Sequence, residues 1–433
     1  MKMMWQRNIN KNLLFMKMNY FFAYGAYAPI VPFISTIGKQ RGYSAFVMGI
    51  ALTALQIPSL IVRPTLGSIT DVYKCRRFMF LAGEVLFALV VIGLVFIPGA
   101  TASEMIDDKI VFETMLFWAF FCIIFLLCLG AVIRSIMEDT ICVSLLGDNV
   151  NNYGRQKVWG SIGYGVVSII SGASVDWFSK GKDYKDYRPG YVISFFFSIM
   201  DIYVSTGIKV VQVKKNKTIG GDLKNVATDF RVIIFFISII CFGFLMAFIQ
   251  NFLFWYLEDI TNLYHPEIKP WIKTVQGLFL ITQYFLSEVP LYFLSSFIIK
   301  RIGHMNVFSL AFLALSIRFM LYSLIKNPII ALSVEILHGF TNALTESAAV
   351  AYAAKLSPVG AEGTMQGLIG MALLGIGTPL GNFVGGYLIK SLGSIITFRL
   401  MSIVAIIVCI IQATMSLIIN RIYRHEDNPV QTS

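Results

Sequence analysis

Long apolar runs separated by short polar segments dominate this chain, and they predict helices that cross a membrane. A helix that crosses the hydrocarbon core of a bilayer needs about 20 mostly apolar residues. Twelve stretches meet that requirement: 18–38, 45–70, 78–97, 116–146, 158–178, 190–208, 232–257, 274–299, 305–325, 328–354, 363–389 and 394–420. The longer runs fit a bilayer by tilting or by extending beyond it. The pattern predicts an all-α integral membrane protein with 12 transmembrane helices.

The longest polar connection between spans divides them into six and six. It runs over 209–231 and is basic. Two six-helix bundles around a central cavity are the arrangement of many secondary transporters. We therefore expect an N-terminal bundle at 1–208, a linker at 209–231, a C-terminal bundle at 232–420 and a cytoplasmic tail at 421–433.

Composition and charge support a membrane protein and orient it. Of the 433 residues, 57% are hydrophobic and 14% are charged, whereas an average soluble protein has about 25% charged residues. With the N-terminus inside, 20 Lys and Arg residues fall in cytoplasmic segments and 11 in exterior ones. This bias predicts that both termini are cytoplasmic. The net charge of +11 is spread over these loops, so we expect no nucleic-acid partner.

The sequence gives no sign of a cofactor, a metal site or an enzyme. Five of the six cysteines lie inside apolar runs, and their spacings match no disulfide framework or zinc site. No Walker A motif is present, which excludes ATP hydrolysis as an energy source. A cleaved leader ending near Ala28 is the alternative for the N-terminus, but the apolar run continues past that point and favours a retained helix.

The segment after the second span predicts a cytoplasmic gate. It contains Gly67, Asp71, Arg76 and Arg77. Gly67 would let two helices approach closely, and Asp71 can accept hydrogen bonds or pair with a cation. A helix end followed by positive-inside charge explains the two arginines but leaves the Gly-x-x-x-Asp spacing unexplained.

This segment resembles the loop signature of the major facilitator superfamily, with Val72 where relatives usually carry Arg. Further motifs follow in chain order: Tyr153-Gly154-Arg155, Ser287-Glu288-Val289-Pro290, Leu337-His338-Gly339 and Gly363-Thr364-Met365-Gln366-Gly367. Together they resemble the lactose-permease-like group, which includes the animal major facilitator superfamily domain-containing 6 branch. The resemblance implies a transporter, since members of known activity are mostly proton-coupled symporters of sugars, nucleosides or aromatic acids.

Ionisable residues inside the C-terminal spans point to a polar cavity. Each is costly in hydrocarbon and needs a partner or water. They are Glu288 in the eighth span, Arg318 in the ninth, and Glu335, His338, Asn342 and Glu346 in the tenth. On a regular helix the last four fall within roughly 80° of one another, so we expect them to face the cavity. A proton relay is one interpretation, and a static network that fixes helix packing is the other.

The resemblance assigns roles to some of these residues. In the lactose permease branch, an acid on helix 8, an Arg on helix 9 and a His on helix 10 handle substrate and protons, and Glu288, Arg318 and His338 match in type and position. That permease has an acid three residues after its His, where this chain has Thr341. Glu335, one turn before His338, is the residue that could take over. The departure leaves uniport open as an alternative to proton coupling.

The N-terminal spans supply a second set of candidates. Arg134 and Glu138 are four residues apart, and either line the cavity or neutralise each other along one helix. Asp139 points about 100° away from Glu138 and is expected to meet Arg155 or Lys157. Such a contact is a substrate-site feature of the lactose permease branch. Further candidates in this half are Gln56, Arg63, Glu84 and Asp201.

The sequence thus favours a transporter that carries a small polar organic solute together with a proton by alternating access. Uniport is one alternative, and a transporter-shaped receptor or scaffold without flux is the other. We expect a small-molecule substrate, protons and the lipid bilayer as partners, and function as a monomer. The plasma membrane is the default location, with endosomal or lysosomal membranes as alternatives.

Overall fold

The computed structural model describes residues 11–97, 105–146, 153–209, 229–356 and 362–422, and all regular structure within these ranges is helical. In the first part of the chain the elements are α1 (Lys11–Tyr27), η1 (Val31–Phe33), α2 (Ile34–Gln40), α3 (Ala45–Ala54), α4 (Ile57–Val72), α5 (Arg76–Phe96), α6 (Asp108–Glu113), α7 (Met115–Leu146), α8 (Tyr153–Phe178) and α9 (Arg188–Thr206).

The second part begins with α11 (Phe230–Tyr264), η3 (Pro266–Trp271), α12 (Ile272–Ile281), η4 (Thr282–Glu288), α13 (Val289–Ile302) and α14 (His304–Leu324). It continues with α15 (Pro328–Ala331), η5 (Leu332–Leu337), α16 (His338–Thr341), α17 (Ala343–Leu356), α18 (Glu362–Gly370), η6 (Met371–Gly377), α19 (Thr378–Leu392) and α20 (Ser394–Ile422). The segments η4 and η6 are π-helical, whereas η1, η3 and η5 are 3-10 helices.

Ten helical segments in the described ranges are long and apolar enough to cross a membrane. The other two predicted spans correspond to α9 and to the run from α15 to α17. In α9, buried Asp201 and the serines Ser194, Ser198 and Ser205 lower the hydropathy. The run from α15 to α17 is broken into short helices and carries Glu335 in its middle. The chain is therefore a multi-pass membrane protein whose described part is all-helical.

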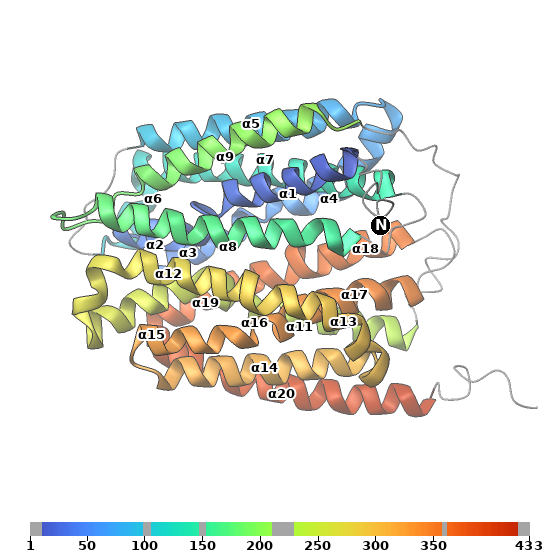
Figure 1. Ribbon diagram of the computed structural model, residues 1–433. Helices are drawn as coiled ribbons and strands as arrows, with labels where there is room; N and C mark the ends of the chain where they lie inside the picture. Colours follow the sequence, from blue (N-terminus) through green and yellow to red (C-terminus); the bar gives the residue numbers. More distant parts are fainter. Residues whose placement is uncertain (1–10, 98–104, 147–152, 210–228, 357–361, 423–433) are drawn as a thin grey trace, which may run out of the picture.

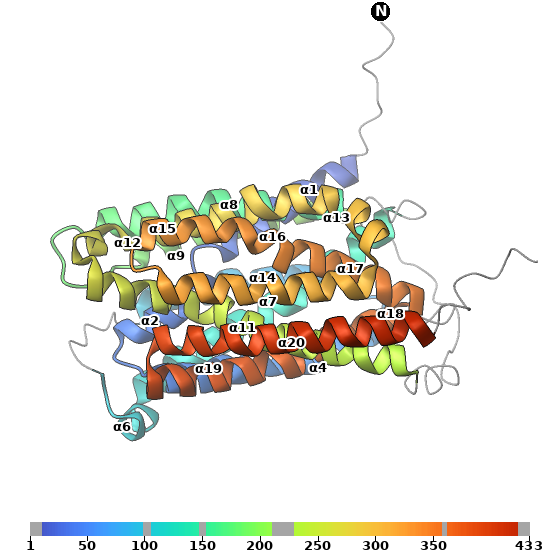
Figure 2. The ribbon, with the colours of Figure 1, turned by 90° about the horizontal axis from the view of Figure 1, so that it is seen from below.

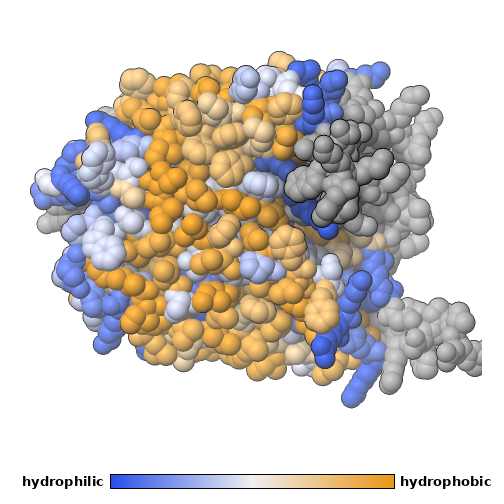
Figure 3. Space-filling view, in the orientation of Figure 1, coloured by the Kyte–Doolittle hydropathy of each residue, from blue (hydrophilic) through white to orange (hydrophobic). Residues whose placement is uncertain are grey.

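The surface shows where the bilayer lies. On the face shown in Figure 3, apolar residues form a broad belt across the middle of the molecule, and hydrophilic residues gather at its two ends. Exposed Leu, Ile and Phe side chains on many helices make up this belt. A continuous exposed apolar belt of this kind is incompatible with water and fits the hydrocarbon core of a membrane.

Helices from the two parts of the sequence gather in separate regions. Those coloured blue to green lie in the upper part of Figure 1, and those coloured yellow to red lie in the lower part. Within the first group α1 packs on α8 and α9, and α5 packs on α7; within the second, α14 packs on α20 and α17. The first described helix begins and the last one ends at the same end of the bundle (Figures 1 and 2). We call this the α20 end, and the opposite one the α6 end.

Two seams join the groups, α8 against α12 and α3 against α19. Both are built on glycine. A Cβ atom on Gly172 would lie 2.2 Å from the carbonyl oxygen of Lys273, and one on Gly277 would lie 2.7 Å from that of Ser168. At the other seam, a Cβ atom on Gly386 would lie 2.8 Å from the Cα of Gly49. Backbones at both seams therefore approach as closely as small-residue packing in membranes allows.

Proline explains most interruptions of the spans. Pro29 and Pro32 lie in the first span between the end of α1 at Tyr27 and the start of α2 at Ile34. Pro290 follows two residues after η4, and Pro379 follows two residues after η6. A proline cannot donate to the carbonyl four residues earlier and its ring crowds that carbonyl, so the turn before it widens.

The tenth span is not the regular helix that the sequence predicted over 328–354. It passes through the 3-10 segment η5, the short α16 and an irregular Asn342 (φ −113°, ψ −71°) before α17 begins. The hydroxyl of Ser287 lies against this break. It donates to the carbonyl of Ile336 (2.7 Å) and accepts from the backbone N–H of Gly339 (2.6 Å). The side chain thus takes over backbone bonds of the tenth span, and a constant 100° per residue does not apply there.

Substituting Gly277 tests the tightness of the α8–α12 seam. Gly277→Ala should lower stability by about 1–3 kcal/mol, because the added methyl group overlaps the backbone of α8. The measurement is thermal unfolding of purified protein in detergent, followed by loss of the monodisperse chromatographic peak. Gly154→Ala is the matched control, since a Cβ there meets no atom within 4 Å and should be neutral or stabilising. Equal melting temperatures for the two variants would contradict the close crossing.

Candidate functional site

A fully buried ion pair forms the centre of the C-terminal group of helices. Arg318 of α14 donates to the Oε2 of Glu335 (2.8 Å), and both side chains are 0% exposed. Glu335 also accepts hydrogen bonds from Gln283 (2.7 Å) and Tyr322. Arg318 donates in addition to the hydroxyl oxygen of Thr341 (2.7 Å). Thr341, which stands where the resemblance leads one to expect an acid, is thus a hydrogen-bond partner of the arginine, and Glu335 carries the opposing charge.

Glu288 lies on the other side of His338 and contacts both groups of helices. Its Oε1 accepts from Asn342 (2.5 Å) and lies 3.4 Å from Nε2 of His338. Its Oε2 accepts from the hydroxyl of Ser161 in α8 (3.1 Å). The Nδ1 of His338 is 3.3 Å from a guanidinium nitrogen of Arg318. Polar contacts therefore run from Arg318 through His338 and Glu288 to α8.

A second polar contact joins the same two groups nearer the α20 end. Lys157 of α8 donates to Glu346 of α17 (3.1 Å), and Tyr292 donates to the other oxygen of Glu346 (2.6 Å). These two charged side chains are 25% and 42% exposed, so water reaches them. The rings of Tyr164 and Tyr284 pack with centroids 4.4 Å apart, and the ring of Tyr284 lies 5.7 Å from that of His338. An aromatic contact and an accessible ion pair thus both join α8 to helices of the other group.

The break in the tenth span does not scatter its four predicted residues. Glu335 contacts Arg318 in α14, His338 and Asn342 contact Glu288, and Glu346 contacts Lys157. The structure connects Arg318, Glu335, His338, Glu288 and Asn342 through side-chain contacts, whereas Glu346 pairs separately with Lys157. The regular helix geometry from which their alignment was inferred is wrong.

The N-terminal candidates form a separate buried network. Arg134 donates to Asp201 of α9 (3.3 Å) and lies 3.8 Å from Glu138, so the expected pairing along α7 is the longer of its two ionic contacts. Asn19 of α1 donates to Asp201 (2.6 Å) and to Glu84 of α5 (3.4 Å). The guanidinium also lies over the ring of Tyr27, 4.6 Å from its centroid.

The expected contact of Asp139 with Arg155 or Lys157 is not formed. Asp139 accepts hydrogen bonds from the hydroxyls of Tyr20 (2.9 Å) and Tyr153 (2.7 Å). Arg155 is exposed at the start of α8, and Lys157 turns to Glu346. Tyrosine hydroxyls satisfy the carboxylate here without a second charge.

The predicted gate segment is described only in part. Gly67 and Asp71 belong to α4, but their side chains fall outside the described ones. Arg77 donates to the carbonyl of Thr206 at the end of α9 (3.0 Å), and Arg76 begins α5. Arg77 thus joins helices within the first group, and the role of the segment as a gate stays a prediction.

Ion pairs that the sequence did not predict close the α6 end between the groups. Lys39 donates to Asp259 (2.6 Å), and Lys273 donates to Glu258 (2.5 Å) and to the hydroxyl of Thr36 (3.1 Å). These charged residues lie just beyond the predicted ends of the spans, so the sequence pattern suggested that they belong to loops. We call Lys39, Glu258, Asp259 and Lys273 the closing cluster.

Further contacts at this end surround Asp176 of α8. Its Oδ2 accepts from the backbone N–H of Thr274 (2.6 Å), and its Oδ1 pairs with Lys185 (2.5 Å). Lys185 also donates to the carbonyl of Pro270 (2.5 Å). Burial lowers the pKa of the Lys185 amino group, and the bond to Asp176 opposes that shift. Lys390 of α19 and Asp108 of α6 form another pair.

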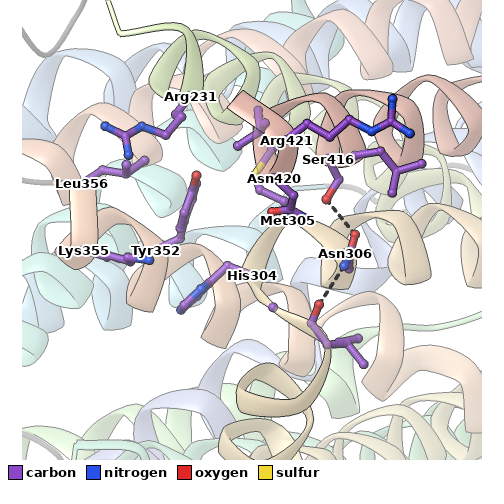
Figure 4. Close-up of a pocket in the computed structure, with 14 residues that line it drawn as sticks. Arg231, His304, Met305, Asn306, Tyr352, Lys355, Leu356, Ser416, Asn420 and Arg421 are labelled. Atoms are coloured by element: carbon purple, nitrogen blue, oxygen red, sulfur yellow. Dashed lines mark hydrogen bonds between the residues drawn. The ribbon is translucent and has the colours of Figure 1, made fainter. Parts of the chain in front are cut away.

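A cavity of about 510 Å³ opens at the α20 end among α11, α14, α17 and α20. Its polar lining is mainly basic, from Arg231, His304, Lys355 and Arg421 (Figure 4). None of the buried ion pairs described above lines it. Among the described residues, no group of three or more His, Cys, Asp and Glu side chains could hold a metal ion.

Comparison with known proteins identifies relatives of this chain. Residues 13–400 match the family described as MFS_1 like family. The major facilitator superfamily domain-containing protein 6-like proteins B and A of Xenopus laevis are each 25% identical to it, over 273 and 271 residues. Each match covers 60% of this chain and 42% of the relative, so less than half of each relative's length is matched.

Solved structures share the fold. The nucleoside transporter NupG gives a TM-score of 0.74 at 15% identity, covering 94% of this chain and 99% of that one. The peptide transporter POT in complex with sulfate gives 0.64 at 11% identity, covering 95% of each. These proteins are membrane transporters by name, not enzymes.

Removing one member of the central ion pair should be strongly destabilising. Glu335→Gln leaves Arg318 charged and buried without a counter-ion, at a cost of about 3–5 kcal/mol. Thermal unfolding in detergent measures the loss, with exposed Glu267→Gln as the matched control. The double variant Arg318→Met/Glu335→Met removes both charges and should be more stable than Glu335→Gln alone. A single variant as stable as the wild-type protein would contradict the pairing.

Proposed function

The chain belongs to the MFS_1 like family, and from this membership we propose that it is a secondary transporter that works by alternating access. We propose twelve transmembrane helices in two six-helix halves, residues 1–208 and 232–420, with both termini in the cytoplasm. The separate gathering of early and late helices supports the two halves (Figure 1). The shared end of α1 and α20 and the Lys and Arg bias of the loops support the orientation.

In this orientation the α6 end faces outward, and the closing cluster is an outer gate. Each of its pairs joins α2 or α12 to α11, and Lys39 with Asp259 links residues from opposite halves. Lys157 and Glu346, nearer the cytoplasmic end, keep partial exposure. The conformation is therefore one with its outer side closed and its site reached from the cytoplasm.

The substrate site of this proposal lies between the halves at Lys157, Glu346, Tyr164, Tyr284 and Tyr292. Tyrosine faces bind flat or partly apolar rings, and the ion pair offers a donor and an acceptor to hydroxyl, amide or carboxylate groups. A small polar organic solute fits this chemistry. Nucleosides are the first class to test, because the fold resembles a nucleoside transporter, followed by sugars and aromatic acids.

One observation carries the proposal of proton coupling: Glu288 bonds to helices of both halves and contacts His338, which in turn meets Arg318. When the halves rock, the bond to Ser161 must break or re-form. A change in the surroundings of a buried carboxyl group changes its proton affinity. Substrate movement and protonation are thereby linked at Glu288.

The alternatives make different predictions in one experiment, uptake by purified protein in liposomes. A symporter accumulates substrate under an inward proton gradient, a uniporter equilibrates it without one, and a receptor or scaffold gives no flux. We further propose function as a monomer, in the plasma membrane by default or in endosomal or lysosomal membranes. The test is purification of the monomer together with imaging of tagged protein in cells.

Glu288→Gln should abolish accumulation driven by a proton gradient. The amide keeps the size of the side chain but cannot exchange a proton in this pH range. Exchange of labelled for unlabelled substrate at equal pH should persist, which separates coupling from binding. Glu267→Gln, at the protein surface, is the control and should accumulate substrate as the wild type does. Normal accumulation by Glu288→Gln would refute this role.

Lys273→Met should open the outer gate more often, because it removes the pair with Glu258 and the bond to Thr36. A cysteine placed at Ser35, which is buried next to Thr36, in a protein without its native cysteines should react several-fold faster with an impermeant thiol reagent added at the α6 side. Lys182→Met is the matched control, since Lys182 pairs with Asp186 in its own loop. An unchanged rate with Lys273→Met would contradict the gate.

A further inference from the structure

The buried network of the N-terminal helices holds more acid than base. Its members come from four helices, α1, α5, α7 and α9: Asn19, Glu84, Arg134, Glu138, Asp201 and Ser205. All are at most 3% exposed. Three carboxyl groups therefore face one guanidinium group in the membrane interior, which leaves a formal charge of −2 if all are ionised.

Nearby charged groups do not supply the missing positive charge. Lys157 of α8 is the next cation near Glu138, but it is paired with Glu346. Arg63 of α4 acts on Asp139, and its Nε donates to Ser59 (2.8 Å). Asp139 of α7 adds a further acid.

On the side of the network, α1 contributes Asn19 and the tyrosines Tyr20, Tyr24 and Tyr27. Tyrosines are neutral and Asn19 carries no charge, so they do not balance the carboxyl groups either. Positive charge must reach the network in another form.

Hydrogen bonding separates the three acids. Both oxygens of Asp201 are occupied, one by Asn19 (2.6 Å) and one by Arg134 (3.3 Å). Glu84 accepts on one oxygen, from Ser205 (2.5 Å) and Asn19, while its Oε2 has no partner in the described structure. Neither oxygen of Glu138 has a hydrogen-bond partner there. A buried carboxylate oxygen without a hydrogen-bond partner makes ionisation costly, by several kcal/mol for a whole group. The two glutamates, which have such oxygens, are therefore the acids that must be neutralised.

The space beside these groups admits very little. A cavity of about 10 Å³ lies among Tyr27, Glu84, Arg134 and Asp201, which is about the volume that one water molecule needs. The described residues also contain no group of acids and histidines arranged for a metal ion. A proton needs only one oxygen and no coordination shell.

We propose that this network is a proton-binding site, in which Glu84 and Glu138 carry one proton each and Asp201 is the carboxylate that pairs with Arg134. Two protons cancel the formal charge of −2. Loss of the proton from Glu138 creates a second carboxylate beside Arg134, whose guanidinium already lies 3.8 Å from it and 3.3 Å from Asp201. Protonation thus sets whether the arginine joins α7 to α9 through Asp201 alone or also pairs with Glu138 within α7. The site lies within the N-terminal helices and is separate from Glu288 and His338.

Infrared spectroscopy of the full-length protein in lipid nanodiscs tests the proposal directly, since protonated carboxyl groups give a C=O band apart from that of carboxylates. At neutral pH, Glu84→Gln and Glu138→Gln should each reduce this band by about the intensity of one group. Glu258→Gln is the matched control: its side chain is only 17% exposed and is paired with lysine, so it should leave the band unchanged. No reduction with either Glu84→Gln or Glu138→Gln would overturn the proposal.

Arg134→Gln gives an independent test if those variants fail to fold. Without the guanidinium, Asp201 loses its counter-ion and should protonate, so the band should gain about one group. An unchanged band would contradict the assignment of Asp201 as the carboxylate. The measurement needs no substrate and no flux, so it stands whether or not the transport proposal and Glu288→Gln behave as expected.

Discussion

A charge in the hydrocarbon layer must find a partner on a neighbouring helix, and this requirement organises the interior of the protein. Arg318 ties α14 to the tenth span through Glu335, and Arg134 ties α7 to α9 through Asp201. Since an isolated buried charge costs several kcal/mol, these pairs fix which helices are neighbours. The groups that we propose to bind protons lie beside these pairs: Glu288 contacts His338, which meets Arg318, and Glu138 lies 3.8 Å from Arg134.

Contacts between the two groups of helices are of two kinds with different mechanical properties. At Gly172 and Gly49 the helix backbones are in direct contact. Such contacts contain no side-chain hydrogen bond or ion pair, so one helix can move against the other without breaking one. The closing cluster and the contacts of Ser161 and Lys157 are directed and must break when the groups separate. Glycine therefore keeps the groups together, while the polar contacts select one conformation.

The sequence predicted the features that depend on neighbouring residues in the chain, which are the positions of the spans and the charged residues inside them. Hydropathy located the ten spans found in the described ranges. The charges inside them and the family resemblance singled out Glu288, Arg318 and His338, which do lie together. The sequence could not give partners that are distant in the chain: Ser161 for Glu288, or Glu258 and Lys273 across a turn. Asp139 was predicted to meet Arg155 or Lys157 because of their opposite charge, whereas two tyrosine hydroxyls donate to it. The break in the tenth span was not visible either, because a hydroxyl on another helix, that of Ser287, stabilises it.

The widened turns η4 and η6 are two defined positions at which helices of this molecule can bend. Helices are stiff because every turn is bonded to the next, and a π segment before a proline interrupts that series. Bending then concentrates there instead of spreading along the rod. η4 ends at Glu288 itself. A small tilt of α13 against α12 therefore reorients this carboxyl group. Bending of half a helix thus changes the direction in which the Glu288 carboxyl group points.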